Sequence, residues 1–260
     1  MYDLVDHLPA WVAAALLLAG GLVATLAGRR LRAQRGGGDT LYAATASLSL
    51  FTLLVGFTFS VALNRYDTRR DLVVEEAAAI FSLWQRLQLQ PVPHRAAMAT
   101  TMRDYVQARL AWANGGMETD RNRPGDSASD VLMERMWNLT RVAGGDGARL
   151  RLMADSLTRV DDAAWRREAI AREHIPLSVI DTLGLFMLLS AFLVGFGGTP
   201  NAQLAVPAHL LLLVMAAVAI LVVIDLDRPR SGLIRVNQMP VHELARFIAR
   251  DMERDPSLRP

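Results

Sequence analysis

Residues 41–63 form an apolar run without a charged side chain, and this run constrains the fold more than any other feature of the sequence. A bilayer core of about 30 Å needs roughly 20 apolar residues in a helix. The run meets that length and continues into the charged sequence NRYDTRRDLVVEEAAAI without a helix breaker. We therefore expect one helix that crosses a membrane and extends into the aqueous phase.

Three further blocks have the length of a membrane span, at about residues 8–28, 175–198 and 206–224. The N-terminus lacks the basic region of a secretory signal, so we expect the first block to be a retained helix. The sequence thus predicts an all-α integral membrane protein with four transmembrane helices in two pairs and a helical cytosolic bundle. The pairs occupy residues 1–64 and 175–226, the helical cytosolic segment residues 65–174, and a cytosolic C-terminal tail residues 227–260.

The positive-inside rule gives the orientation, because cytoplasmic flanks carry an excess of arginine. Nine membrane-proximal arginines belong to the middle segment and the tail: Arg65, Arg69, Arg70, Arg166, Arg167, Arg172, Arg228, Arg230 and Arg235. The loop after the first span carries Arg29, Arg30, Arg32 and Arg35. The count favours cytoplasmic termini and a cytoplasmic middle segment, although the arginine-rich loop at residues 29–35 leaves the opposite orientation open.

Apolar residues at helical spacing predict four helices in the middle segment. Their apolar faces are Val73, Ala77, Ile80, Trp84 and Leu87; Met98, Met102, Tyr105 and Trp112; Leu132, Met136, Leu139 and Val142; and Leu150, Met153, Leu157, Val160 and Ala164. Pro91 and Pro93 separate the first two helices, and Ser127 with Asp130 forms a capping pair for the third. Gly144 and Gly145 end that third helix.

Small and hydroxyl side chains form a stripe on the second span, at Thr45, Ser49, Thr52, Gly56 and Ser60. At about 100° per residue they fall within an arc of roughly 80°. One interpretation is close helix packing, which small residues allow in membranes. The other is a wetted pore wall, with Leu53 and Phe57 on its flank as an apolar constriction.

Charged residues at the ends of the spans also have two interpretations. Arg65 lies at the point where the second span leaves the membrane. There it is either an interfacial anchor or, if several copies surround an axis, a charge that attracts anions. Asp181 near the start of the third span is either a functional acid or a headgroup-level residue. After the fourth span comes a cluster that is either a solvated flank or a specific turn: Asp225, Asp227, Arg228, Pro229 and Arg230.

No motif indicates catalysis. The five histidines lack ligand spacing, cysteine is absent, and neither GxSxG nor HExxH occurs. We expect no enzyme, no metal site and no cofactor, and the net charge of +2 gives no reason to expect a nucleic-acid partner.

Two segments, LLVGFTFSVALNRYDTRRDLVVEEA (53–77) and DLDRPRSGLIRVNQMPV (225–241), resemble the bacterial bestrophin-like domain family of multi-pass membrane proteins. This family is distantly similar to the bestrophin anion channels, in which a Gly-Phe step is followed eight residues later by an arginine, as Gly56-Phe57 is by Arg65. The resemblance implies a pore neck at Ser49, Leu53 and Phe57 and a pore-mouth charge at Arg65. Ser49 departs from the apolar pattern of such necks, and Asp67 stands where bestrophins have a second aromatic residue.

The resemblance implies a homo-oligomeric anion channel, a pentamer in the bacterial inner membrane, whose partners are the lipid bilayer and small anions. The second span would line its pore, and Thr45, Thr52, Gly56 and Ser60 would support helix packing. The alternative is a non-conducting interaction or scaffold protein that acts through its cytosolic bundle. In that case the face with Val73, Ile80, Trp84 and Leu87 would bind a partner or a second copy.

Overall fold

The computed structural model of the chain describes residues 10–35, 41–115, 127–144, 147–197, 205–228 and 232–259, and within these ranges every regular element is helical. The elements are α2 (Ala10–Arg35), α3 (Leu41–Leu87), α4 (Val92–Asn114), α5 (Ala128–Ala143), α6 (Gly147–Arg172), α7 (Leu177–Gly197), α8 (Ala205–Asp227), α9 (Met239–Arg254) and a short 3₁₀ helix, η2 (Pro256–Leu258). The predicted all-α class is confirmed. The expected continuation of the second span is also confirmed, because α3 runs through 47 residues as one helix.

Four helical stretches in the described ranges are long and apolar enough to cross a membrane: Trp11–Gln34, Tyr42–Leu87, Gly147–Gly197 and Pro207–Asp227. The third joins α6 and α7, and its apolar part is α7, because α6 carries many charged residues. The four predicted membrane helices therefore correspond to α2, the first part of α3, α7 and α8.

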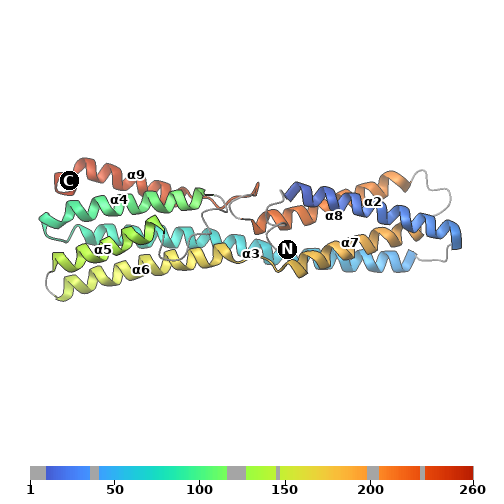
Figure 1. Cartoon of the computed structure of the whole chain (residues 1–260), viewed down its shortest axis with the longest axis horizontal. Helices are drawn as coiled ribbons and strands as arrows, with labels where there is room; N and C mark the ends of the chain where they lie inside the picture. The colour runs from blue at the N-terminus through green and yellow to red at the C-terminus, as the bar shows by residue number, and fades with distance from the viewer. Residues whose placement is uncertain are drawn as a thin grey trace. The chain divides into compact units, whose positions relative to one another are not determined.

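The chain divides into two compact units, and the first contains α2, α3 as far as Arg65, α7 and α8 (Figure 1). Its apolar core consists of Phe51, Leu183, Met187, Ala191, Leu213, Ala217, Ile220 and Ile224. Helices α2 and α7 approach very closely, because a Cβ atom at Gly28 would overlap the backbone oxygen of Phe192, and one at Gly195 would overlap that of Thr25. Glycine is required at this crossing, and the Thr25 hydroxyl donates a 3.3 Å hydrogen bond to the carbonyl of Ala191 across it.

The second unit contains α3 from Tyr66, together with α4, α5, α6, α9 and η2 (Figure 1). Its core includes the predicted face of α3, with Val73, Ile80, Trp84 and Leu87 at most 1% exposed. The predicted faces of the other helices join it through Met98, Met102, Tyr105, Met136, Met153, Leu157 and Val160. Two members were assigned wrongly: Val142 is 74% exposed and Leu150 is 40% exposed, because each lies near the end of its helix, beyond the packed part.

The helix boundaries follow local chemistry. Ser127 and Asp130 form a complete capping box at the start of α5, as predicted, and Gly144 ends that helix with a φ of +59°. A proline in the first turn of α4 fits there because that turn's N–H groups have no partner within the helix. Gly145 lies outside the described residues.

The C-terminal tail is more ordered than the sequence interpretation supposed. Residues Met239–Arg254 form α9, which buries Val241, Leu244, Ile248 and Met252 in the core of the second unit. These residues recur at intervals of three and four, so the apolar face was present in the sequence and was overlooked.

Candidate functional site

The first part of α3 has one face that packs inside the first unit. Phe51, Thr58 and Ala62 on this face are buried. The Ser47 hydroxyl is 2.8 Å from the hydroxyl of Ser190 on α7, which ties the two helices together. The Thr58 hydroxyl donates to the Leu54 carbonyl within the helix, so its polar group is satisfied.

The other face of α3 carries every residue that was predicted to line a pore. Ser49, Leu53 and Phe57 are exposed, with Leu53 at 53% and Phe57 at 64%. The members of the predicted packing stripe are exposed on the same side: Thr45, Thr52, Gly56 and Ser60. We call these seven residues the α3 stripe. The structure thus brings them together on one surface that the described residues of the first unit leave uncovered.

Close packing within the chain does not explain the α3 stripe. A Cβ atom built at Gly56 would have no neighbour within 4 Å, whereas those at Gly28 and Gly195 would overlap backbone atoms. Among the described glycines of this unit, Gly28 and Gly195 bring two helix backbones into contact, at the α2–α7 crossing. The α3 stripe remains available to lipid, to water or to a second copy.

Arg65 does not lie on the α3 stripe. At about 100° per residue, Arg65 points about 80° away from the direction of Phe57 around the helix axis and about 160° away from the direction of Ser49. Its side chain is partly buried, and its Nη1 atom is buried without a hydrogen-bond acceptor among the described residues. The sequence resemblance implied that Arg65 would line the same pathway as Ser49, Leu53 and Phe57. In the helix, however, Arg65 points to a different side of α3.

The cluster after α8 forms a specific turn. Asp225 and Asp227 are both buried. The two carboxylate oxygens of Asp225 accept hydrogen bonds of 2.8 Å from the backbone N–H groups of Leu233 and Ile234. Asp227 accepts a 3.0 Å bond from the N–H of Ile175, two residues before the start of α7. These carboxylates therefore fix the chain within the first unit, which is a structural role; Pro229 and Arg230 lie outside the described residues.

Asp181 and His209, two further titratable residues of the membrane helices, differ in their surroundings. Asp181 is exposed on α7. His209 on α8 is 3.4 Å from a guanidinium nitrogen of Arg29 on α2, so it joins two helices. Among the described residues, no three His, Cys, Asp or Glu side chains gather as a metal site.

A buried ionic network in the second unit was missed from the sequence. The Glu76 side chain is fully buried and accepts a 2.5 Å hydrogen bond from Nε of Arg109, and it also accepts one from Arg167. Arg109 donates a second 2.5 Å bond to Glu168. Burial by itself would lower the pKa of Arg109, but the carboxylates of Glu76 and Glu168 outweigh it and raise the pKa above its usual range.

Trp112 completes this network. The guanidinium of Arg109 is 4.5 Å from the centre of the Trp112 ring, and that of Arg167 is 5.2 Å away. Such cation–π contacts are favourable when the cation is desolvated. The signal was present in the sequence, because Arg109 follows Tyr105 by four residues on the apolar face of its helix.

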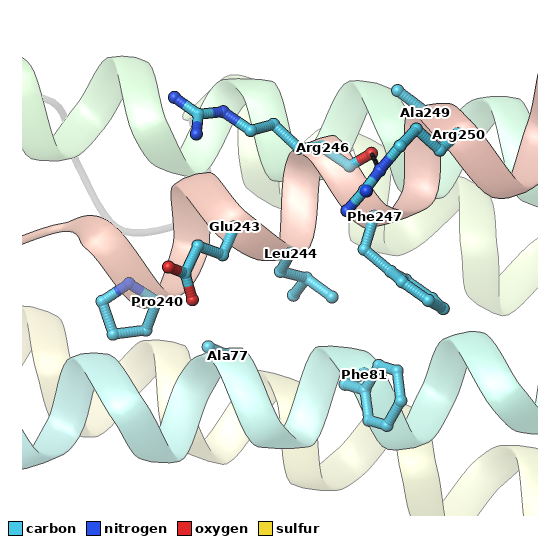
Figure 2. Close-up of a pocket in the computed structure, with 9 residues that line it drawn as sticks. All are labelled: Ala77, Phe81, Pro240, Glu243, Leu244, Arg246, Phe247, Ala249 and Arg250. Atoms are coloured by element: carbon cyan, nitrogen blue, oxygen red, sulfur yellow. Dashed lines mark hydrogen bonds between the residues drawn. The ribbon is translucent and has the colours of Figure 1, made fainter.

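A groove of about 900 Å³ lies between α3 and α9 in the second unit (Figure 2). Phe81 of α3 and Phe247 of α9 meet edge to face across it, with ring centres 5.4 Å apart. Arg246 and Arg250 of α9 line its rim, together with Glu243. The groove therefore combines exposed aromatic surface with positive charge.

Most of the sequence matches the model of a known family. The family model of the Bestrophin-like domain matches residues 10–241. The chain belongs to the Bestrophin-like domain family. The family resemblance inferred from the two quoted segments is thus confirmed, while a comparison with curated protein sequences finds no match.

Solved structures show that this Bestrophin-like chain shares its fold with bestrophin homologues. A bacterial bestrophin homologue from Klebsiella pneumoniae, in a single-substitution variant, matches with a TM-score of 0.71 and 14% identity, over 95% of this chain and 97% of that one. A second structure of a homologue from the same organism matches with a TM-score of 0.69 and 13% identity, over 95% and 98%. At these identities the likeness concerns the fold.

Proposed function

We propose that this Bestrophin-like protein is a homo-oligomeric ion channel in which copies of α3 surround the pathway. The observation that carries the proposal is the α3 stripe, where hydroxyl side chains alternate with Leu53 and Phe57 on a surface that the rest of the described chain does not cover. Hydroxyl groups can face water, and an apolar ring can gate a pore by dewetting. The family and the shared fold support the same function.

The pathway is proposed between copies because the interior of the first unit is packed. Phe51, Leu183, Met187 and Ile220 are each at most 4% exposed and fill the space between its helices. A continuous aqueous path there would require a different packing. Copies related by rotation would instead place equivalent α3 stripes around one axis.

The assembly and its placement in the cell belong to the same proposal. The resemblance favours a pentamer in the bacterial inner membrane, with the bilayer as its surroundings. The arginine distribution favours cytoplasmic termini, a cytoplasmic segment at residues 65–174 and a cytoplasmic tail at residues 227–260.

The charge of the permeating ion depends on which residues of α3 face the axis. Anion selectivity was expected from Arg65, which lies outside the register of the α3 stripe. Asp67 and Asp71 are exposed. At about 100° per residue along α3, Asp67 projects in about the same direction as Ser49, and Asp71 in about the same direction as Leu53. Acidic side chains at a pore mouth concentrate cations, so this register favours cations over small anions.

Flux from purified protein in liposomes tests conduction. Phe57→Ala should raise the flux, by roughly tenfold if the ring contributes ~1.4 kcal/mol to the barrier. Phe59→Ala is the matched control, because Phe59 lies two residues away on a different side of the helix and is also exposed, at 39%. Absence of flux in the unsubstituted protein and in both variants would refute the channel. Equal effects of Phe57→Ala and Phe59→Ala on the flux would refute the assignment of Phe57 to the pore wall.

Reversal potentials in a salt gradient test selectivity. Asp67→Asn combined with Asp71→Asn should reduce the preference for cations, whereas Arg65→Gln should leave it nearly unchanged. An anion-selective current that requires Arg65 would support the original expectation.

A non-conducting scaffold is the second candidate function. The partner surface first considered for it is not accessible, since Val73, Ile80, Trp84 and Leu87 are buried inside the second unit. The groove between α3 and α9 is the exposed surface that supports a scaffold instead (Figure 2). A protein that conducts no ions but loses a binding partner on Phe247→Ala would favour this function.

A further inference from the structure

One end of the first unit, where α2 and α7 end and α8 begins, is strongly basic in sequence. Residues 28–42 contain a single acidic residue, Asp39, against four arginines: Arg29, Arg30, Arg32 and Arg35. The segment that enters α8, residues 198–204, has no charged residue. The chain at this end therefore carries three more positive than negative charges.

The described carboxylates of the first unit lie at the opposite end of its helices. Helices α2 and α7 run in the same direction, because Gly184 faces Leu17 and Gly195 faces Thr25. Asp181 precedes Gly195 by about 21 Å along α7, at 1.5 Å per residue. By the same measure Asp225 lies about 24 Å from His209 along α8. None of these carboxylates can neutralise the arginines after Thr25.

Arg32 lies on the side of α2 that packs against α7. It follows Gly28 by one turn, and Gly28 touches the backbone of Phe192 and Phe196. Its Nη1 atom is buried and has no hydrogen-bond acceptor. The carbonyl end of a helix favours a positive charge, but here it leaves this N–H group unsatisfied, which costs free energy. An acceptor from outside the chain would remove that cost.

Arg29 and His209 add two more donors at this end. Nη2 of Arg29 is 3.4 Å from Nδ1 of His209. Arginine has only donors, so Nδ1 accepts and the ring proton of neutral His209 is on Nε2. The contact leaves the charge of Arg29 uncancelled, and neither Arg29 nor Arg32 pairs with a described carboxylate.

The neighbouring surface indicates the depth of these donors in the membrane. Tyr42, at the start of α3, is 86% exposed and is joined to the end of α2 by only five residues. Exposed tyrosines at the ends of membrane helices mark the headgroup level. One to two turns before Arg29, α2 exposes Leu22, Val23 and Leu26. Charged donors at headgroup level thus adjoin apolar surface that acyl chains can cover.

We propose that this end of the first unit binds the phosphate group of an anionic phospholipid. Arg32 and Arg29 would donate hydrogen bonds to the phosphate oxygens, for which guanidinium groups are well suited. The acyl chains would lie along the apolar surface of α2. The site gives the arginine-rich loop a role apart from membrane orientation, and it does not depend on ion conduction.

Native mass spectrometry of the full-length protein in detergent measures lipid binding. Dioleoylphosphatidylglycerol should bind at least about fivefold more tightly than dioleoylphosphatidylcholine, whose headgroup has no net charge. Arg32→Gln and Arg29→Gln should each weaken phosphatidylglycerol about fivefold, the change that ~1 kcal/mol per arginine produces.

Arg30→Gln is the matched control. Arg30 is exposed, and at about 100° per residue it points about 160° away from Arg32. This variant removes the same charge from the same turn and should leave phosphatidylglycerol binding nearly unchanged. Thermal unfolding without added lipid confirms that each variant is folded.

Four outcomes would overturn the proposal. The first is equal binding of the two lipids, which would exclude recognition of charge. The second is unchanged phosphatidylglycerol binding in both Arg32→Gln and Arg29→Gln. The third is an equal loss in Arg30→Gln, which would indicate diffuse attraction by the loop. The fourth is displacement of phosphatidylglycerol by millimolar inorganic phosphate, which would identify a free anion as the ligand.

Discussion

Glu76 offers the sharpest test of what stabilises the second unit. Its side chain is 0% exposed and is bonded to both Arg109 and Arg167. Glu75, the preceding residue, is 50% exposed and pairs with Arg166 at 3.1 Å. The substitutions Glu76→Gln and Glu75→Gln therefore make the same chemical change in two opposite environments.

The expected magnitudes differ widely. Removing one partner of a buried ion pair costs about 3–5 kcal/mol, because it leaves the other charge buried without compensation. Glu76 compensates two guanidinium groups, so we expect the upper part of that range. The exposed pair of Glu75 contributes about 0–1 kcal/mol.

Thermal unfolding of the full-length protein in detergent measures the difference. At about 2–4 °C per kcal/mol, a cost of about 4–5 kcal/mol for Glu76→Gln should lower the apparent Tm by about 8–20 °C, and Glu75→Gln should lower it by at most about 4 °C. Circular dichroism reports the helix loss, and the fluorescence reports a change in the surroundings of the five tryptophans, Trp112 among them.

Equal shifts for the two variants would refute the reasoning, since burial would then have no influence on the cost. A stabilised Glu76→Gln protein would also refute it, because it would mean that Arg109 and Arg167 find other compensation.

Four further substitutions test the packing and the turns by the same unfolding measurement. Gly28→Ala should destabilise the protein by about 1–3 kcal/mol, because the added methyl group overlaps α7. Gly56→Ala should be neutral or stabilise the protein by about 0.5–1 kcal/mol, because the surroundings of Gly56 are open. A larger loss of stability for Gly56→Ala than for Gly28→Ala would contradict the described crossing. Ser127→Ala removes a capping box and should cost about 1 kcal/mol, and an unchanged Tm would mean that the cap is not formed. Asp225→Ala leaves two backbone N–H groups without their acceptor, so we expect a loss of at least about 3 kcal/mol; a loss below about 1 kcal/mol would indicate that water replaces the carboxylate.

The sequence predicted the elements well where a single helix decides the pattern. Apolar length identified the four candidate spans, and the spacing of Val73, Ile80 and Trp84 identified the buried face of α3. Helix ends could also be predicted because they depend on residues close together in the sequence, as the capping box at Ser127 shows. The prediction failed near the ends of helices, where the exposed Val142 continues the apolar spacing beyond the packed region.

The sequence by itself determined the membrane fold and grouped the residues of the α3 stripe on one face, because both depend on periodicity along a single helix. Only the tertiary structure decided that, in the part of the chain that it describes, no helix of the first unit covers this face and that Gly28 and Gly195 form the close crossing instead. It also decided that Glu76, Arg109 and Arg167 meet. Arg109 lies 33 positions and Arg167 lies 91 positions after Glu76 in the sequence, so they become neighbours of Glu76 only when three helices pack together. The physical reason is that periodicity assigns a side chain to a face, whereas its partner depends on which helices surround that face.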